Sequence, residues 1–286
     1  MHWLLHLILG ALLHLKFATA LSTLSKRDAD FWTVRTRLDR SYVDPESYRA
    51  DKYFHESTFD KHYDGRFADK PLPYDERQEH LSASVQAYLS MMQEIGIETW
   101  LMHGTLLGWY WNRKIMPWDS DVDVMISESS MHYLASYYNM TMHYFKSPGR
   151  QRKRGYLLEI NPHCWKRDID EENKIDARWI DTDVGLYIDI TVLRRNSTAT
   201  KLGLREQMMV KDNHHYAYDD IFPLRDSVFE GTPALVPFAY PEILIEEYGD
   251  QALSDMNHEL HHFDTGKNAW LPQKLAVTTS DYGEDE

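Results

Sequence analysis

The sequence predicts an α/β (α+β) domain in which helices flank a mixed sheet. Apolar residues recur at helical spacing between residues 77 and 95, and apolar β-branched segments follow near 97–102, 121–126 and 186–193. Alternation of these two patterns is typical of a sheet with helices packed on its faces. The chain has 286 residues, of which 43% are hydrophobic, so it can bury a sizeable core.

The elements of the main domain are predicted in chain order. A helix over 77–95 ends at Gly96, and a strand over 97–102 follows it. A turn of small residues then opens a second short helix that runs through Trp111. Farther along, the patterns predict a helix over 127–138 and strands over 156–160, 175–181 and 186–193.

The two ends of the chain differ in composition from this domain. The region 28–74 is polar, aromatic and irregular, which predicts an extension wrapped on the core, and residues 280–286 are acidic and are expected to be disordered. The chain therefore divides into a signal peptide (1–20), a propeptide-like irregular extension (21–74), a main domain (75–272) and an acidic tail (273–286).

The turn His103-Gly104-Thr105 has features of a phosphate-binding loop. Backbone N–H groups at the start of a helix attract anions, and Gly104 lets a phosphate approach the backbone closely. His103 is placed to donate to a phosphate oxygen, while Thr105 either binds substrate or caps the helix, which is the commoner role of such a residue. The turn lacks the several glycines of a P-loop or of a dinucleotide fingerprint.

Asp119, Asp121 and Asp123 occupy alternate positions at the entrance to an apolar strand. Because side chains of a strand alternate between its faces, Asp121 and Asp123 are expected on one side. Val122 and Val124 then point the other way, into the core. Two carboxylates at this spacing repel each other unless a cation lies between them, and Mg²⁺ or Mn²⁺ suits such oxygen donors. The alternative is a solvated acidic loop that caps the next helix.

Asp189 lies in the middle of an apolar segment that is long enough for a buried strand. Burial of an isolated ionised carboxylate is costly unless a cation or several donors compensate it. If this strand lies beside that of Asp123, the acids converge on one site. The alternative is a salt bridge between Asp189 and an arginine such as Arg178.

These motifs together resemble the LicD family, which includes fukutin-type proteins and sits in the nucleotidyltransferase-fold superfamily. The resemblance extends over about 88–249, and it includes Phe229-Glu230-Gly231 and Glu247-Tyr248-Gly249. The block 180–189, together with the N-terminus, is most similar to the fungal Mnn4-like mannosylphosphorylation branch. The long Lys/Glu repeat tail found in some members of that branch is missing, so no role of such a tail is expected here.

The resemblance implies a transferase with a nucleotidyltransferase-like mixed sheet. Such an enzyme moves a phospho-substituent, in first place mannose phosphate, from a nucleotide-diphosphate donor such as GDP-mannose to a hydroxyl of a glycoprotein glycan. The implied cofactor is Mg²⁺ or Mn²⁺, and the implied catalytic and metal-binding residues are Asp121, Asp123 and Asp189, the last of which either binds metal or takes the acceptor proton. The implied substrate-binding residues are His103, Gly104, Thr105 and Asp119, with Asp119 behind the metal ligands.

Two other functions stay open. One is a noncatalytic regulator or scaffold that assists a partner transferase. Such a protein tolerates the loss of an acid, and this chain has lost none of the motif's acids. The other is an enzyme that moves the nucleotide itself, for which a secretory location offers no evident substrate.

The charge balance excludes one class of partner. Lys and Arg total 31 against 45 Asp and Glu, for a net charge of -14, which argues against nonspecific binding of nucleic acid. A nucleotide-sugar donor remains compatible through metal and local positive charge. The cluster Arg150, Arg152, Lys153 and Arg154 either supplies such charge or forms a solvated loop, and the solvated loop is the favoured interpretation.

The N-terminus predicts the secretory pathway. An apolar stretch over 3–15 and the small residues Ala18-Thr19-Ala20 resemble a signal peptide cleaved before Leu21. The stretch is short against the roughly 20 apolar residues of a spanning helix, so cleavage is favoured over a Golgi membrane anchor. Lys26-Arg27 resembles a dibasic processing site. We therefore expect a Golgi-luminal or secreted glycoprotein, with glycosylation sequons at Asn139 and Asn196.

Cysteine and histidine patterns carry little further chemistry. Cys164 is the only cysteine, so an intrachain disulfide and a cysteine-based zinc site are excluded, and a quiet, half-buried thiol is favoured over a nucleophile. The remaining histidine clusters lack the partners of a zinc motif and are expected at the surface; they are His214, His215, His258, His261 and His262.

Overall fold

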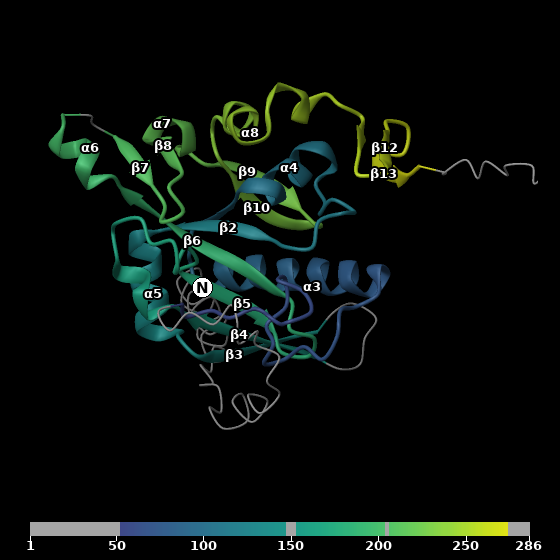
Figure 1. The fold of residues 1–286 in the computed structure, drawn as a ribbon, viewed down its shortest axis with the longest axis horizontal. Helices are drawn as coiled ribbons and strands as arrows, with labels where there is room; N and C mark the ends of the chain where they lie inside the picture. Colours follow the sequence, from purple (N-terminus) through teal and green to yellow (C-terminus); the bar gives the residue numbers. More distant parts are fainter. Residues whose placement is uncertain (1–51, 147–152, 204–205, 274–286) are drawn as a thin grey trace, which may run out of the picture.

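The computed structural model describes residues 52–146, 153–203 and 206–273. A ten-stranded mixed sheet runs in the order β3-β4-β5-β6-β2-β1-β10-β9, while β7 pairs with β6 and β8. A separate sheet of β11, β12 and β13 lies near the C-terminal end (Figure 1). The strands are β1 (Thr99–Leu101), β2 (Asp123–Ser127), β3 (Thr141–Phe145), β4 (Arg154–Ile160), β5 (Ala177–Asp181), β6 (Tyr187–Arg195), β7 (Gln207–Met209), β8 (His215–Ala217), β9 (Arg225–Phe229), β10 (Thr232–Val236), β11 (Asn257–His258), β12 (His261–Asp264) and β13 (Ala269–Pro272).

Helices lie on the sheet as the alternating sequence pattern predicts (Figure 1). They are α3 (Tyr74–Glu94), α4 (His103–Asn112), α5 (Glu128–Tyr137), α6 (Ser197–Lys201), α7 (Tyr218–Ile221) and α8 (Tyr240–Tyr248), with 3₁₀ turns η2 (Pro162–Trp165) and η3 (Asp250–Leu253). α3 packs along β5, β6 and β10, and α4 packs on β1 and β2 and against α8. The predicted mixed α/β fold is therefore confirmed.

The first helix shows why the pattern was informative. Its predicted apolar stripe is buried in the structure, at Leu81, Val85, Tyr88, Leu89 and Met92. The helix begins three residues earlier than predicted. Its C-terminal end is followed by Gly96, whose φ of 71° lies in the left-handed region that favours glycine after a helix.

The central strands place the site. β2 pairs in parallel with β6 and antiparallel with β1, so β2 lies inside the sheet with partners on both sides. Val122 and Val124 are 1% and 2% exposed, as the alternation predicts. The strand itself begins only at Asp123, so Asp121 lies in the preceding loop instead of within the strand as expected.

Residues 52–73 contain no helix or named strand and pack against the main sheet. Tyr63 is fully buried and forms an isolated bridge to Leu186. The backbone N–H of Asp64 donates to the carbonyl of Gly185 at 2.8 Å. A side chain at Gly185 would meet the Cβ of Ala68 at 2.7 Å, so this close approach requires glycine.

Candidate active site

Asp123 on β2 lies opposite Asp189 on the parallel neighbour β6. Residues opposite each other on adjacent strands point to the same face and are about 5 Å apart. The expected adjacency of the two acid-bearing strands is therefore present. Both acids are held by buried apolar neighbours, because Val124 and Ile190 form the next pair in the register.

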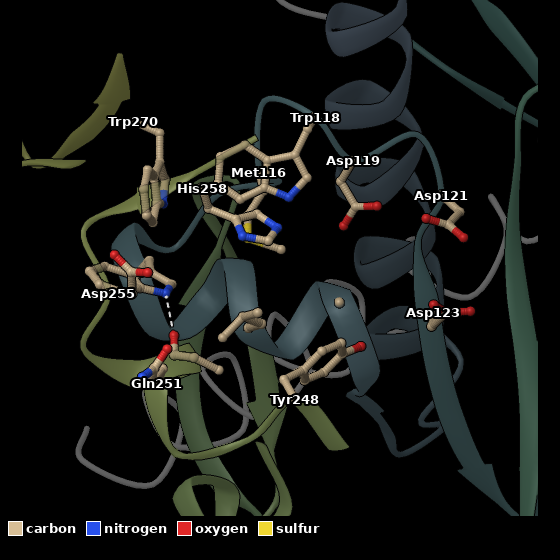
Figure 2. Close-up of a pocket in the computed structure, with 14 residues that line it drawn as sticks. Met116, Trp118, Asp119, Asp121, Asp123, Tyr248, Gln251, Asp255, His258 and Trp270 are labelled. Atoms are coloured by element: carbon tan, nitrogen blue, oxygen red, sulfur yellow. Dashed lines mark hydrogen bonds between the residues drawn. The ribbon is translucent and has the colours of Figure 1, made fainter. Parts of the chain in front are cut away.

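Asp119, Asp121 and Asp123 all line one cavity of about 440 Å³, whose wall also includes Asp255. Figure 2 shows the first three gathered at one end, with the ring of Tyr248 below them. The volume lies in the range of small-molecule sites. Asp119 was expected behind the other two acids, but it contributes to the cavity wall directly.

Two of these acids, Asp119 and Asp123, have raised pKa values. Burial raises the pKa of Asp123 to about 7; His103 opposes this shift, and the charges of Asp121 and Asp189 add to it. Burial likewise raises the pKa of Asp119 to about 9, together with a hydrogen bond to Asp121 and the charges of Asp121 and Asp123. Carboxylate repulsion at this end of the cavity is therefore only partly compensated by the protein.

A divalent metal fits these donors in part. Among the residues that the structure describes, no three His, Cys, Asp or Glu side chains are arranged closely enough to hold a metal ion together. Mg²⁺, however, is commonly held by one or two carboxylates and by substrate phosphates. Asp121 and Asp123 offer such a pair on the cavity wall, and a cation there would relieve their repulsion. Metal binding by these acids stays a prediction.

Asp189 faces a different partner. Arg178 Nε donates to Asp189 Oδ1 at 2.7 Å, and Arg178 Nη2 donates to Glu56 at 3.0 Å. The expected adjacency of the two strands and the alternative salt bridge to Arg178 are therefore both present, while metal binding by Asp189 stays a prediction. Asp189 is less available as a metal ligand than the other two acids, since one of its oxygens is already engaged.

A second cavity of about 370 Å³ adjoins the first, and Asp121 lines both cavities. Its walls carry Asp189 and Arg178, together with Lys61 and His62 from the N-terminal segment. His62 Nε2 lies 3.6 Å from Asp121 Oδ2. The segment that was expected only to wrap the core therefore contributes side chains at the junction of the two cavities.

Gly104 and Thr105 shape the acid end in different ways. A Cβ at Gly104 would lie 3.1 Å from Asp119 Oδ2, so the missing side chain keeps the start of α4 open toward the acids. Thr105 is 3% exposed, and its Oγ1 accepts a hydrogen bond from the Asp123 backbone N–H at 2.8 Å. The expected capping role is wrong: the N-cap is Met102, and no side chain caps this helix.

His103 forms an ion pair beside the acids. Its φ of 53° is unusual for a residue with a side chain, and its Nδ1 lies 3.0 Å from Glu247 Oε2. Burial lowers the pKa of His103, but the hydrogen bond to Glu247 and the charge of Asp123 outweigh it and raise the pKa to about 9. The imidazolium adds positive charge near Asp123. Its expected contact with a phosphate oxygen stays a prediction, because Nδ1 is engaged by Glu247.

The far end of the first cavity was not found by sequence analysis. It is lined by Trp118 and by three residues from the C-terminal elements, Gln251, His258 and Trp270 (Figure 2). His258 was expected at the surface; it is exposed, yet its ring lies 5.1 Å from that of Trp118. Trp118 stands inside the acid motif, but nothing in the sequence linked it to residues more than a hundred positions away.

Several other predicted residues have defined places. Cys164 is 2% exposed, so it is fully buried instead of half-buried, and burial raises the pKa of its thiol to about 11, which favours a quiet thiol over a nucleophile. Arg154 pairs with Glu79 at 3.0 Å, Lys153 is exposed, and Arg150 and Arg152 lie outside the described residues. Among the histidines, His214 pairs with Asp212, while the ring of His261 lies 5.4 Å from that of Trp118.

The two sequons differ in exposure. Asn139 is exposed, and its Oδ1 accepts from the Ile160 backbone N–H at 3.0 Å. Asn196 is 8% exposed, and its side chain caps α6 by accepting from the Ala199 N–H at 3.0 Å. Glycosylation of either residue stays a prediction, and the exposed Asn139 is the more accessible of the two.

The predicted signal peptide, the dibasic site and the acidic residues 280–286 lie outside the described residues. Within residues 52–146, 153–203 and 206–273, no helix combines the length and the apolar character needed to cross a membrane.

Comparison with known proteins gives two curated relatives, both from Saccharomyces cerevisiae. The chain is 32% identical over 245 residues to Mannosyltransferase regulator 4, which is 78% of this chain and 20% of that protein. It is 34% identical over 127 residues to Mannosyltransferase regulator 14, which is 44% of this chain and 13% of that protein. The chain therefore spans only a small part of the length of these relatives.

A family model described as LicD/FKTN/FKRP, nucleotidyltransferase domain, matches residues 96–239, which is half of the chain. The matched range contains the turn at the start of α4, the acids around β2, and Asp189 on β6. The chain belongs to the LicD/FKTN/FKRP nucleotidyltransferase-domain family.

Proposed function

We propose that the protein is a metal-dependent glycan phosphotransferase of the secretory pathway, Golgi-luminal or secreted. It moves a phospho-substituent, in first place mannose phosphate, from a nucleotide-diphosphate donor to a hydroxyl of a glycoprotein glycan. One observation carries this proposal: Asp121 lies at the junction of two cavities, one lined by Asp119 and Asp123 and the other by Asp189. Two substrates can therefore meet at one carboxylate.

The first cavity suits the donor diphosphate. The start of α4 presents backbone N–H groups, Gly104 leaves room beside Asp119, and the protonated His103 adds positive charge nearby. Mg²⁺ or Mn²⁺ bound by Asp121 and Asp123 would neutralise the diphosphate charge. Thr105 keeps Asp123 in place through its bond to the Asp123 backbone.

The second cavity suits a glycan acceptor. Sugar hydroxyls both donate and accept hydrogen bonds, and this cavity offers both kinds of partner, including Lys61, Asn161 and Glu56. Burial raises the pKa of Asp189, with Arg178 opposing it, so this carboxylate is suited to take a proton from an acceptor hydroxyl. The acceptor oxygen then bonds to the phosphorus nearest the transferred group, and the bond to the nucleoside monophosphate breaks.

A noncatalytic regulator is the second candidate. Both curated relatives are named mannosyltransferase regulators, and the described residues contain no group of three ligands placed for a metal. In that case the chain keeps the fold and assists a partner transferase. Asp189 would then serve only as the partner of Arg178.

A donor screen tests the proposal. Purified protein is incubated with Mn²⁺, an oligomannose acceptor and a set of nucleotide-diphosphate donors that includes GDP-mannose. We expect release of nucleoside monophosphate together with a matching phospho-sugar mass on the glycan. Absence of both products with every donor, from protein with a cooperative thermal transition, would contradict the proposal and favour the regulator.

A further inference from the structure

The acid-lined cavity has two chemically different ends. Asp119, Asp121 and Asp123 lie at one end, and Trp118, His258 and Trp270 lie toward the other (Figure 2). The acid end adjoins the second cavity through Asp121, whereas none of the three aromatic residues lines that cavity. A bound molecule can therefore extend from the acids away from the acceptor side.

The aromatic end is a packed cluster of rings. The indole of Trp118 makes an edge contact with that of Trp270 at a centroid distance of 4.9 Å, and the ring of His258 lies 5.1 Å from Trp118. Trp111 also lines the cavity, at 4.9 Å from Trp270, and its Nε1 donates to the Ala252 carbonyl at 3.1 Å. Rings held in this way offer planar surfaces for stacking.

Trp270 also has an unused donor. The residue is 6% exposed, and its Nε1 has no hydrogen-bond acceptor among the described residues. A buried N–H without a partner costs free energy, so an acceptor atom of a ligand would relieve it. Figure 2 shows the Trp270 indole on the cavity wall beside His258. Gln251 and Asp255 line the same end and supply further polar groups.

Much of this end lies outside the family domain. The family model ends at residue 239, whereas Gln251, Asp255, His258 and Trp270 all follow it. The C-terminal elements are held to α4 by specific contacts, such as the bond from Tyr110 to the Leu253 carbonyl at 3.2 Å. This part of the cavity wall therefore lies beyond the range that the family model matches.

From these observations we infer that the aromatic end binds the base of the nucleoside diphosphate, between His258 and Trp270. This inference rests on the proposed function. The group that is transferred must approach the acceptor, which enters from the second cavity beside Asp121. The leaving nucleoside must then point the opposite way, toward the rings, and a base stacks on aromatic rings through its planar face.

Binding measurements test this inference without requiring turnover. Calorimetry in the presence of Mn²⁺ compares inorganic pyrophosphate with GDP, CDP, UDP and ADP. The variants are His258→Ala, Trp270→Phe and Asp123→Asn. The matched control is His132→Ala, because His132 stacks on the exposed Trp165 at 4.4 Å away from the cavity. Thermal melting checks that each variant is folded. If Trp270→Phe melts at a lower temperature than wild type, the test rests on His258→Ala, because His258 is exposed and its replacement disturbs the fold less.

We expect at least one nucleoside diphosphate to bind wild-type protein more tightly than pyrophosphate does. His258→Ala and Trp270→Phe should each lower the affinity for that nucleotide by about tenfold and leave the affinity for pyrophosphate unchanged. Asp123→Asn should lower the affinity for both ligands. His132→Ala should change neither affinity. One outcome would overturn this inference but not the donor site of the proposed function. In that outcome, His258→Ala and Trp270→Phe leave the nucleotide affinity unchanged, while Asp123→Asn lowers the affinity for both ligands. Failure of wild type to bind pyrophosphate or any nucleotide would overturn the donor site of the proposed function as well.

Discussion

The imidazole of His103 and the carboxylate of Glu247 are 3.0 Å apart, and this pair joins the first turn of α4 to the last turn of α8. Glu247 also accepts from the hydroxyl of Tyr216 at 3.2 Å. The next residue, Tyr248, lines the acid cavity. The ion pair therefore fixes both the turn beside Asp123 and one wall of the cavity.

Stability should depend on pH through this pair. The pKa of His103 is raised from an ordinary 6.5 to about 9, so its contribution is fully present below pH 6.5 and is lost as the pH rises through 9. The contribution is at most about 3 kcal/mol. Asp119 and Asp123 produce a decline of the same sign, so the test is the difference between wild type and Glu247→Gln in urea unfolding at pH 6 to 10. Parallel curves would contradict the role of the pair.

Asp123→Asn should abolish transfer and stabilise the metal-free protein at pH 8. Because the pKa of Asp123 is raised to about 7, wild-type protein loses stability as the pH rises from the ordinary value of 3.8 through 7. Asparagine has nearly the same shape and carries no charge. The melting temperature of the variant should therefore exceed that of wild type at pH 8, while the exposed control Asp226→Asn should change neither property. Wild-type turnover in Asp123→Asn would contradict the metal site.

Thr105→Val should lower stability by about 1–3 kcal/mol, because the backbone N–H of Asp123 loses its acceptor in a buried position. Thr105→Ser keeps the hydroxyl and should recover most of this loss. Turnover should fall in Thr105→Val even at temperatures where the protein is fully folded, since Asp123 is then less firmly placed. Equal stability of the Val and Ser variants would show that the bond is unimportant.

Glycosylation tests the proposed secretory location. We expect Asn139 to carry a glycan, because it is exposed, so Asn139→Gln should remove the mass that an N-glycan-removing enzyme releases. Asn196 is buried as a helix cap, so Asn196→Gln should leave the glycan mass unchanged and cost about 1 kcal/mol of stability. A glycan-free protein that retains Met1 would contradict the location.

The sequence predicted those parts of the fold in which one periodic pattern persists. α3 shows a helical stripe from Leu81 to Met92, and β6 is a long strand that is mostly apolar, so both were recognised. β11 and β13 have only two and four residues, too few for a period to be visible. The turn at Glu230 and Gly231 joins β9 to β10, and both residues have the positive φ that fits a tight hairpin. Sequence patterns did not predict the two strands on either side of this turn.

For the site, too, features with a local sequence pattern were predicted, and those that depend on tertiary contacts were not. Asp121 and Asp123 were predicted because their spacing is local. The partner of Asp189 depends on which strands are neighbours, so the sequence left metal and Arg178 as alternatives. Thr105 was assigned to a helix cap because its tertiary contact with the Asp123 backbone has no local signature. Trp270 was missed for the same reason.

Asp189 separates the catalyst from the regulator most directly. Asp189→Asn keeps the shape of the side chain and retains an oxygen that can accept from Arg178, but it cannot take a proton from an acceptor. The measurement is glycan phosphate in cells that express wild-type or Asp189→Asn protein at equal abundance, with thermal melting as the folding control. The proposed enzyme predicts a loss of glycan phosphate by orders of magnitude with a nearly unchanged melting temperature. Normal glycan phosphate from a folded Asp189→Asn protein would contradict it and identify the chain as a regulator.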